Sequence, residues 1–425
     1  MKHRPVQTTA SGNTYPRIIL WLIAVAAAIQ IIYGFTLPIV GDDAMFHLNW
    51  LDQFAQLRSK GVDYPRWLTQ SYGGFGSPTF YFYPPLPYFL GSVLSGLTSN
   101  IASLYQIVAF IATALSCWTC YYYLRTLQIA SVPAIAGSLF YVIAPYRFVD
   151  LYARNALGEH FSFVFLPLLL VSIELIRQAN GFDRKGVTSI IVGAAGWAGA
   201  LLVNIPAAVI LALTFVVYGV VRLRDVLSRT YLAVIAGVLG LLISSIYLLP
   251  VFELREHTQM NHIFDIGSQE QKWSFILLEF FQNELTAARI LNALTLVISV
   301  AGLVACIIAW RKKNLAEERH DLLPTLIALF SIGIFFQLPG ISALLYEITP
   351  INLIKYSWRW NVMLTLALAV IVTQLRPSRY HVIASVALAA VLVSTLFVAV
   401  RFGKEFAVHR PYEVIKAYYN DAPEY

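Results

Sequence analysis

The chain has 425 residues, of which 58% are hydrophobic and only 12% are charged, and its mean hydropathy is +0.66. A soluble domain carries about twice that charged fraction, so the composition excludes an ordinary soluble enzyme and predicts a membrane protein with several spans. The net charge of +7 suggests a nucleic-acid-binding protein only if the basic residues gather on a binding surface.

The chain opens with a polar segment, residues 1–17, which precedes an apolar run over residues 18–40. This run is too long for the apolar core of a typical signal peptide, so we expect an uncleaved first transmembrane helix. Ten further apolar runs are predicted to cross the membrane: 101–124, 128–146, 161–177, 187–203, 205–221, 231–252, 289–310, 322–338, 360–375 and 380–400.

The apolar segment 84–98, "PPLPYFLGSVLSGLT", decides the topology. As a twelfth span it would place the basic loops on alternating sides of the membrane. As a helix lying at the outer interface, it places 16 of the 30 basic residues in short connections on one face. Short basic loops are typical of the cytoplasmic side, so we predict eleven spans, with the N-terminus inside and the C-terminus outside. The basic excess is then a topology signal, and we expect no nucleic-acid partner.

This topology gives one polytopic transmembrane domain over residues 18–400. Its first outer loop, 41–100, is expected to carry interfacial helices, and 253–288 forms a second large outer loop. Residues 401–425 form an outer tail. Loops of this length are usually functional or disordered, and their content of aromatic residues and glycine argues for order.

The stretch "GDDAMFHLNW", residues 41–50, places two acids and a histidine just after the first predicted span. Residues 44–58 have the pattern of an amphipathic helix that lies in the membrane interface. Asp43 and His47 are four residues apart and share one face of it. The simpler interpretation is that Asp42 marks the boundary with water.

A second cluster lies in "PYRFVDLYARNALGEHF", residues 145–161, which we expect to contain a short outer loop. Five charged or titratable residues stand close together there: Arg147, Asp150, Arg154, Glu159 and His160. Arg154 and Glu159 could simply pair, and a surface pair contributes little to stability. Alternatively, they present a carboxylate and a cation to an outer cavity.

The third cluster, "INLIKYSWRWNVML" at residues 351–364, leads into the tenth predicted span. Lys355 and Arg359 lie four residues apart among aromatic residues. Such a pattern suits an aromatic belt with snorkelling cations. It suits a phosphate clamp equally well, because arginine offers paired donors that match a phosphate group.

Five stretches occur in an order that resembles a known family. They are "GDDAMFHLNW", "GVDYPRW", "YGGFGSPTFYFYPPLPYFL", "YRFVDLYARNALGE" and "IKYSWRW". The chain resembles the bacterial membrane proteins labelled 6-pyruvoyl-tetrahydropterin-synthase-related, a label that does not define an activity. Those proteins in turn resemble the C-type integral-membrane (GT-C) glycosyltransferases, which draw a sugar from a polyprenyl-phosphate carrier. The resemblance implies an all-α, GT-C-like fold with juxtamembrane helices at the outer face.

The resemblance also implies roles for individual residues. In C-type transferases the acid after the first span is the general base toward the acceptor hydroxyl, and the matching residue here is Asp43, with Asp42 as its neighbour. His47 is expected to hold Asp43 in place. Glu159 is the further expected catalytic residue, and with Arg154 it would orient the acceptor or the base. The expected substrate or carrier-phosphate contacts are Arg147, Arg154, Lys355, Trp358 and Arg359, with Tyr83 among the aromatic residues that could stack on a sugar. Ser357 and Asn204 depart from the pattern, where relatives carry a proline and a histidine.

The expected function is therefore inverting transfer of a sugar from a polyprenyl-phosphate-linked donor to an acceptor glycan, lipid or protein. The reaction is expected at the outer face of the bacterial cytoplasmic membrane, in contact with membrane lipid. A divalent metal, Mg²⁺ or Mn²⁺, is an open alternative, because Asp42, Asp43, His47 and Glu159 offer suitable ligand atoms.

Two other classes of protein remain open. One is a flippase or transporter for a lipid-linked sugar, which requires ionisable residues along a path through the bilayer. The other is a non-catalytic envelope scaffold with the same fold.

Overall fold

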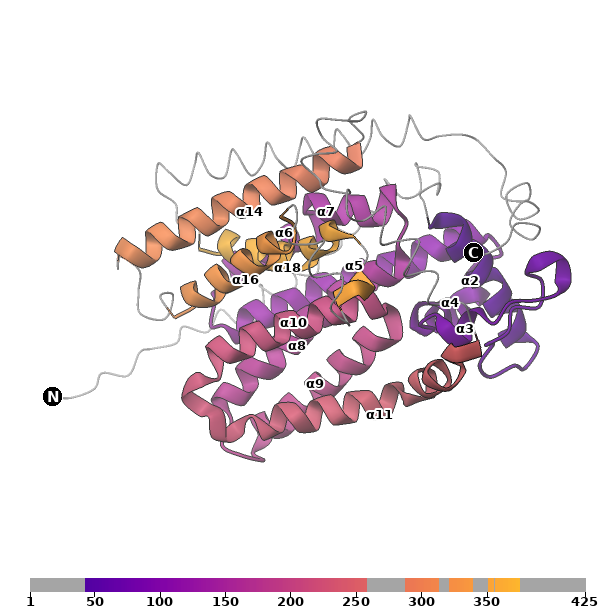
Figure 1. Cartoon of the computed structure of the whole chain (residues 1–425), viewed down its shortest axis with the longest axis horizontal. Coiled ribbons are helices and arrows are strands. Elements are labelled where there is room, and N and C mark those ends of the chain that lie inside the picture. The colour runs from indigo at the N-terminus through magenta and orange to yellow at the C-terminus, as the bar shows by residue number, and fades with distance from the viewer. Residues whose placement is uncertain (1–42, 258–286, 313–320, 339–350, 355, 375–425) are drawn as a thin grey trace.

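The computed structural model describes residues 43–257, 287–312, 321–338, 351–354 and 356–374 (Figure 1). The predicted spans 18–40 and 380–400 lie outside the described residues, as do the two tails and most of the loop 253–288. Seven helical segments of the described part are long and apolar enough to cross a membrane, so the chain is an all-helical membrane protein. They comprise α5 (Ile101–Thr126), α6 (Ser131–Ile143) with its continuation to Ala153, α8 (Leu157–Gln178), α9 (Arg184–Val203), α10 (Ile205–Arg222), α11 (Tyr231–Leu254) and α14 (Ala287–Lys312).

Two further apolar helices are shorter than predicted. They are α16 (Leu323–Phe335) and α18 (Asn361–Val372), with 13 and 12 residues. At about 1.5 Å per residue, neither covers a hydrocarbon core of ~30 Å by itself. Every residue of α18 from Asn361 to Val370 is buried, because α6, α14 and α16 surround this helix. The described residues therefore leave the predicted count of eleven spans open.

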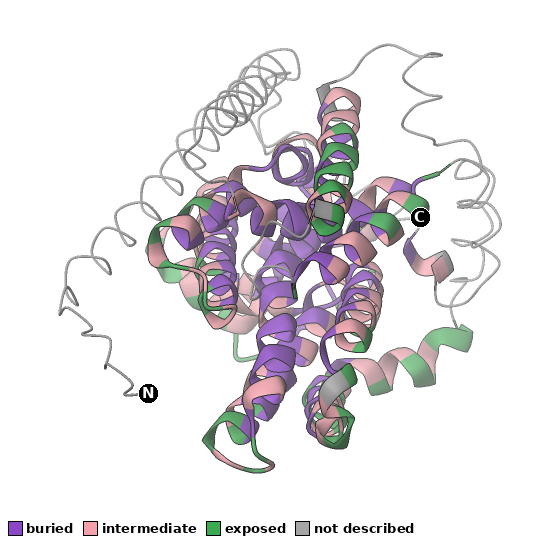
Figure 2. Ribbon diagram, turned by 90° about the vertical axis from the view of Figure 1, so that its left-hand side faces the viewer, coloured by how far each residue is buried: buried purple, intermediate pink, exposed green. Residues whose placement is uncertain are grey.

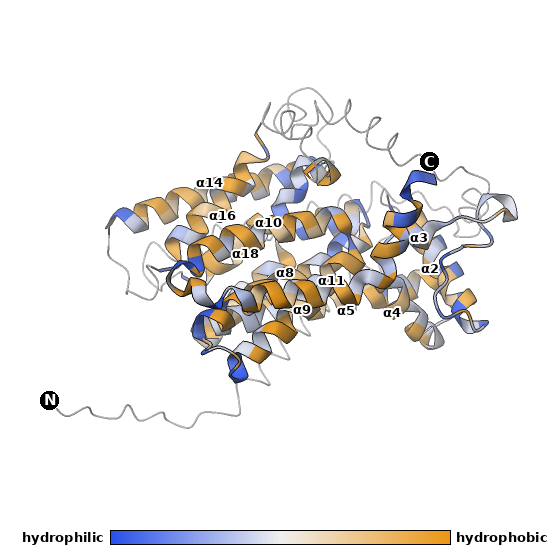
Figure 3. Ribbon diagram, turned by 60° about the horizontal axis from the view of Figure 1, so that its bottom comes forward, coloured by the Kyte–Doolittle hydropathy of each residue, from blue (hydrophilic) through white to orange (hydrophobic). Residues whose placement is uncertain are grey.

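Helix α8 packs against α5 and α9 and also contacts α10 (Figure 1). Figure 2 shows that the buried residues gather in the middle of the bundle. Helix α8 is the most buried of the seven long segments, whereas α11 has exposed leucine, isoleucine and valine side chains along much of its length. Figure 3 shows apolar residues covering the outward faces of the long helices. In a membrane, lipid covers such apolar faces, so their exposure is expected for a bundle of transmembrane helices.

An outer layer of short helices covers one end of the bundle (Figure 1). It consists of α2 (Ala44–Ser59), α3 (Thr79–Phe82) and α4 (Leu86–Leu94), with the 3₁₀ turn η1 (Tyr72–Gly74) between α2 and α3. Helix α4 has nine residues and spans only about 14 Å, less than a hydrocarbon core of ~30 Å. The position of segment 84–98 at the outer interface stays a prediction.

Helix α2 matches the predicted helix 44–58, but its surroundings differ from the prediction. Its apolar face packs on α4 and α5, with Phe54 against Phe80 at 4.8 Å between ring centroids. Part of its polar side is buried as well, because Gln53 Nε2 donates to Ser71 Oγ at 3.2 Å and Gln53 Oε1 accepts from the amide of Gln70 at 2.9 Å. The helix is therefore built into the protein and does not simply lie on the membrane surface.

The opposite end of α8 carries a buried network of ion pairs. Glu174 accepts from Arg222 Nε at 2.7 Å and from Arg177 Nη1 at 2.8 Å. Arg222 and Arg177 also bind Asp321 Oδ2, at 2.6 and 3.1 Å, just before α16 begins. The Tyr218 hydroxyl donates to Glu174 Oε1 at 2.6 Å, the same oxygen that accepts from Arg222 Nε. We call these residues the inner-end network, and it fastens α8, α10 and the start of α16 together.

Candidate functional site

The segment predicted as a short outer loop is largely helical and buried. Ala144 interrupts α6 with an extended backbone, Pro145 then starts α7 (Pro145–Phe148), and a π-helical turn, η3, follows (Val149–Ala153). Helix α8 begins at Leu157, so only three residues separate the two helical segments. The prediction failed because the charged residues of this segment pair with one another inside the protein. π-helical turns occur often at functional sites, and this one lies beside the largest cluster of charges at the outer-layer end.

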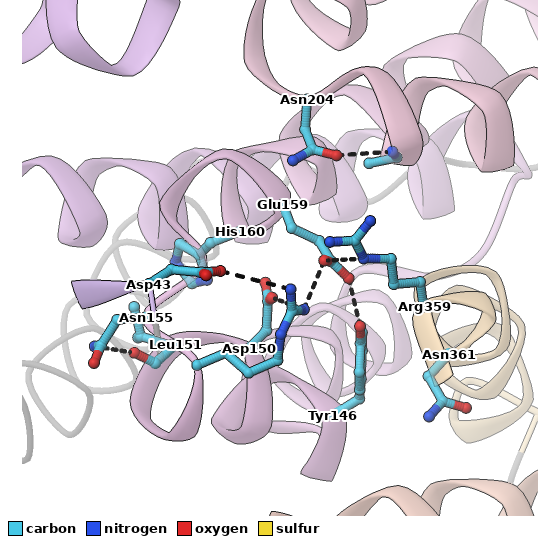
Figure 4. A network of polar contacts seen from close by, with 12 residues as sticks. Asp43, Tyr146, Asp150, Leu151, Asn155, Glu159, His160, Asn204, Arg359 and Asn361 are labelled. Carbon is cyan, nitrogen blue, oxygen red and sulfur yellow. Dashed lines mark hydrogen bonds and ion pairs between the residues drawn. The ribbon is translucent and has the colours of Figure 1, made fainter. Parts of the chain in front are cut away.

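Glu159, in the first turn of α8, is the centre of that cluster (Figure 4). Its Oε2 lies 2.7 Å from Arg154 Nη1 and 3.1 Å from Arg359 Nε. Its Oε1 accepts a hydrogen bond from the hydroxyl of Tyr146. The contact with Arg359 is an ion pair whose angles fall short of a hydrogen bond. Arg154 and Glu159 therefore pair with each other, which was one of the two alternatives from the sequence. The structure adds Arg359 to this pair.

Arg154 connects this centre to two other acids. Its Nη1 lies 3.3 Å from Asp150 Oδ1, and its Nη2 lies 3.7 Å from Asp43 Oδ2. The backbone amide of Asp43 also donates to the Arg154 carbonyl at 2.8 Å, which fixes the start of α2 against the start of α8. The Asp43 side chain is 38% exposed, while those of Asp150 and Glu159 are almost fully buried. Asp43 is therefore the most exposed acid of this cluster.

His47 has a different partner from the one expected. Its Nδ1 lies 2.5 Å from the Tyr88 hydroxyl, and the contact with Asp43 is the backbone bond of the helix. Burial lowers the pKa of His47 to about 4; the nearby Asp43 raises it and Arg154 lowers it further. The imidazole is thus neutral at physiological pH, and its side chain fastens α2 to α4.

Arg147 also lies apart from the cluster, although the sequence suggested a substrate contact. It is fully buried, donates to the His160 carbonyl and to Ser116 Oγ, each at 3.2 Å, and stacks on Phe163 with 4.2 Å between its guanidinium carbon and the ring centroid. These partners belong to α5 and α8. Arg147 therefore connects α7 to α5 and α8.

The third sequence cluster forms the 3₁₀ turn η7 (Ser357–Trp360) ahead of α18. The ring of Trp358 stacks on Tyr356 at 4.5 Å with an angle of 12° between the planes, and the Arg359 guanidinium lies 5.3 Å from the same Tyr356 ring. This stack directs Arg359 toward Glu159. Lys355 and Asp42 lie outside the described residues, so their predicted roles stay predictions.

Tyr83 and Asn204 approach the first turn of α8 from other elements. A Cβ built on Gly158 would lie 3.4 Å from both the Tyr83 hydroxyl and Asn204 Nδ2. Asn204 also caps α10 by accepting from the amide of Ala207 at 2.9 Å, which explains an asparagine at that position. Burial raises the pKa of Tyr83, so its phenol stays protonated and able to donate.

Within the described residues, no group of three or more histidines, cysteines or acids is arranged to hold a metal ion. The ligand atoms expected for such a site are engaged elsewhere, since His47 contacts Tyr88 and Glu159 binds two arginines. Asp42 is outside the described part of the chain. The metal alternative stays a hypothesis.

One residue of the cluster was missed by the sequence analysis. Tyr146 follows an apolar run and looks like an ordinary interfacial aromatic residue, yet its hydroxyl contacts Glu159. No spacing or motif distinguishes it from the other tyrosines of the chain. Only the break between α6 and α7 places it there.

Comparisons with known proteins agree with this architecture. The profile of the 6-pyruvoyl-tetrahydropterin synthase related domain, a membrane protein family, matches residues 80–404. The chain belongs to this family. No curated protein matches the chain.

Among solved structures, the chain is similar to the oligosaccharyltransferase of Archaeoglobus fulgidus tethered with an acceptor peptide, at a TM-score of 0.53 and 14% identity over 92% of this chain. It is also similar to the arabinofuranosyltransferase AftD from Mycobacteria, at 0.52 and 16% identity over 91%. The matched regions cover 55% and 27% of those longer proteins. The chain therefore shares its fold with the matched regions of these two proteins.

Proposed function

We propose that the chain is a membrane glycosyltransferase that transfers a sugar from a polyprenyl-phosphate-linked donor to an acceptor glycan, lipid or protein. The reaction would take place at the outer face of the bacterial cytoplasmic membrane. One observation carries the proposal: Arg154 and Glu159 join a partly exposed carboxylate, Asp43, to a cation beside the bundle, Arg359. A base for the acceptor and a cation for the carrier phosphate thus occur in one connected cluster.

In this proposal Asp43 removes the proton from the acceptor hydroxyl. The hydroxyl oxygen forms a bond to the anomeric carbon of the donor while the bond from that carbon to the phosphate oxygen breaks. The electron pair leaves with the polyprenyl phosphate, and attack from the opposite side inverts the anomeric configuration. Arg359, with Lys355 beside it in the sequence, stabilises the charge that grows on the departing phosphate.

Arg154 and Glu159 assist without touching substrate. Arg154 lies between Asp43 and Glu159, and its ion pairs with both acids hold the Asp43 side chain in place. Trp358 and Tyr356 hold Arg359 from behind by stacking. No step of this mechanism uses a metal ion.

The inner-end network argues against the flippase alternative. A lipid-linked sugar that crosses the bilayer needs an ionisable path through the bundle, but Glu174, Arg222 and Asp321 bind one another across α8, α10 and the start of α16. The described part of the bundle is thus fastened at that end. The scaffold alternative makes no demand on Asp43, and this difference provides the test.

The test uses a deletion strain complemented with wild type, Asp43→Asn or Asp52→Asn at matched membrane levels. Asp52 lies on the same helix, where it accepts from Gln56 at 2.8 Å, so Asp52→Asn is a matched control. Mass spectrometry of lipid-linked sugars and envelope glycans should show one glycan restored by wild type and by Asp52→Asn. Asp43→Asn should accumulate the polyprenyl-linked donor. If Asp43→Asn restores the same profile as wild type, Asp43 is no base, and the scaffold or flippase interpretation takes its place.

A further inference from the structure

The carboxylate of Glu159 is buried among Arg154, Arg359 and Tyr146. It is 1% exposed, and a single oxygen, Oε2, faces the guanidinium groups of both Arg154 and Arg359. An acid that is buried between two arginines is poorly placed to exchange a proton with substrate. In this arrangement Glu159 instead fixes the positions of the Arg154 and Arg359 guanidinium groups.

The torsion that orients this carboxylate is intrinsically soft. Rotation about the terminal bond of a glutamate has broad, roughly two-fold preferences, so the plane of the carboxylate can turn and move the oxygen that faces the arginines. The Tyr146 hydroxyl donates to Oε1 and removes this freedom, because rotation of the carboxylate would break that hydrogen bond. The oxygen that both arginines share is then fixed in one place.

Tyr146 is itself held firmly. It is the second residue of α7, directly after Pro145 and the extended Ala144. Its side chain is fully buried, with its ring 6.3 Å from that of Phe163. The backbone break after α6 thus aims a rigid phenol at the first turn of α8.

We infer that Tyr146 is a positioning residue for the carrier-phosphate clamp: through Glu159 it fixes the place of Arg359. This inference rests on the proposed function, since the clamp has a role only if Arg359 meets a lipid phosphate. Its direct consequence concerns binding. Loss of the phenol hydroxyl should weaken the affinity for a polyprenyl phosphate and raise the donor KM, each about tenfold, with a smaller change in kcat, because a hydrogen bond to a charged group is lost.

Tyr141 provides a matched control on the neighbouring helix. It is equally buried and lies beside the same Phe163, at 5.5 Å between ring centroids, but its hydroxyl donates to the Phe163 carbonyl at 3.0 Å. Tyr141→Phe removes a buried hydroxyl without touching Glu159. A loss caused by packing or general destabilisation should appear in both variants.

The experiment compares wild type, Tyr146→Phe, Tyr141→Phe and Glu159→Gln, together with the double variant of Tyr146 and Glu159, in lipid nanodiscs. A short-chain polyprenyl phosphate is the binding probe, and donor KM and kcat are measured alongside. Support requires about tenfold weaker binding in Tyr146→Phe, near wild-type binding in Tyr141→Phe, and no further loss from Tyr146→Phe once Glu159 is glutamine. If Tyr146→Phe does not fold, Glu159→Gln must weaken binding by at least as much.

Equal binding in the two phenylalanine variants, full additivity with Glu159→Gln, or no binding of the probe by wild type would each overturn the inference. Absence of sugar transfer by a wild-type protein that binds the probe would remove the proposed function instead. In that case the binding comparison still decides the role of Tyr146.

Discussion

Arg359 Nε lies 3.1 Å from Glu159 Oε2, although the glutamate lies in the first turn of α8 and the arginine lies in η7, the turn ahead of α18. The candidate site is therefore complete only when the C-terminal part of the described chain docks on α8. The side chains of Glu159 and Arg359 are only 1% and 12% exposed. Their contact is therefore not an incidental pair on the surface. The contact supports a joint role and can be tested from the arginine side.

Arg359→Lys should raise the donor KM about tenfold, because lysine keeps the charge but loses the planar fork that matches a phosphate. The measurement is the initial rate of sugar transfer over a range of donor concentrations. Arg125→Lys is the control, since Arg125 ends α5 and donates to the Ile129 carbonyl, away from Glu159. Equal KM values for the two variants would place the phosphate clamp elsewhere.

Gly158→Ala should reduce transfer and lower the melting temperature. The new Cβ would lie 2.4 Å from the Val203 carbonyl oxygen, so the first turn of α8 must shift and take Glu159 with it. Such overpacking costs about 1–3 kcal/mol. Gly237→Ala is the matched control in another helix, because its Cβ would have its nearest neighbour at 3.9 Å. Identical melting curves and rates for the two variants would contradict this packing.

Stability should fall as the pH falls below about 6.5 toward 4. The pKa of His47 is about 4 in the folded protein and near 6.5 when unfolded, so the unfolded state binds more protons between those values. The stabilisation from the neutral imidazole is fully present above the unfolded pKa and is lost as the pH approaches the folded one. Melting temperatures in detergent across pH 7.5 to 4.5 measure it.

His47→Gln should flatten this pH dependence, and His257→Gln should leave it unchanged, because His257 is exposed in the turn after α11. A slope that is the same in all three proteins would assign the acid sensitivity to other groups.

Arg222→Gln should destabilise the protein by about 3–5 kcal/mol, because it leaves Glu174 buried with fewer cations. Arg224→Gln, at an exposed position two residues later, is the control and should melt like wild type. Since the inner-end network lies at the far end of α8 from Glu159, the kcat of Arg222→Gln should stay near wild type at temperatures where it is folded. A selective loss of kcat without a change in melting temperature would show that the two ends of α8 are functionally coupled.

The long helices could be located from the sequence because the length of an apolar run is nearly sufficient to define a span. Predicted spans 187–203 and 205–221, for example, correspond to α9 and α10 within a few residues, with Asn204 between them. Helix α2 was also predicted almost to the residue. Apolar length says less about α18, whose residues are buried among other helices and too few to cross a membrane alone.

The candidate site was predictable in part. Asp43, Arg154, Glu159 and Arg359 were all singled out, and the structure joins them in one cluster. Their charges suggested an open loop, because sequence alone cannot show that opposite charges compensate one another in a buried place. The sequence also could not show toward which neighbours the side chains point. His47 and Arg147 lie close to the cluster along the chain but point to Tyr88 and α5, while Tyr146 points into it.

The two buried glutamates of α8 have a consequence for how the protein is made. When α8 leaves the ribosome, Glu159 and Glu174 have only Arg154 and Arg177 as nearby cations, and their other arginines, Arg222 and Arg359, are still to be synthesised. Charged groups in a lipid-facing helix are costly, so α8 reaches its final environment only after later helices have arrived. A chain truncated before η7 would lack Arg359 and leave Glu159 short of one cation, so α8 should then be less stable in the membrane.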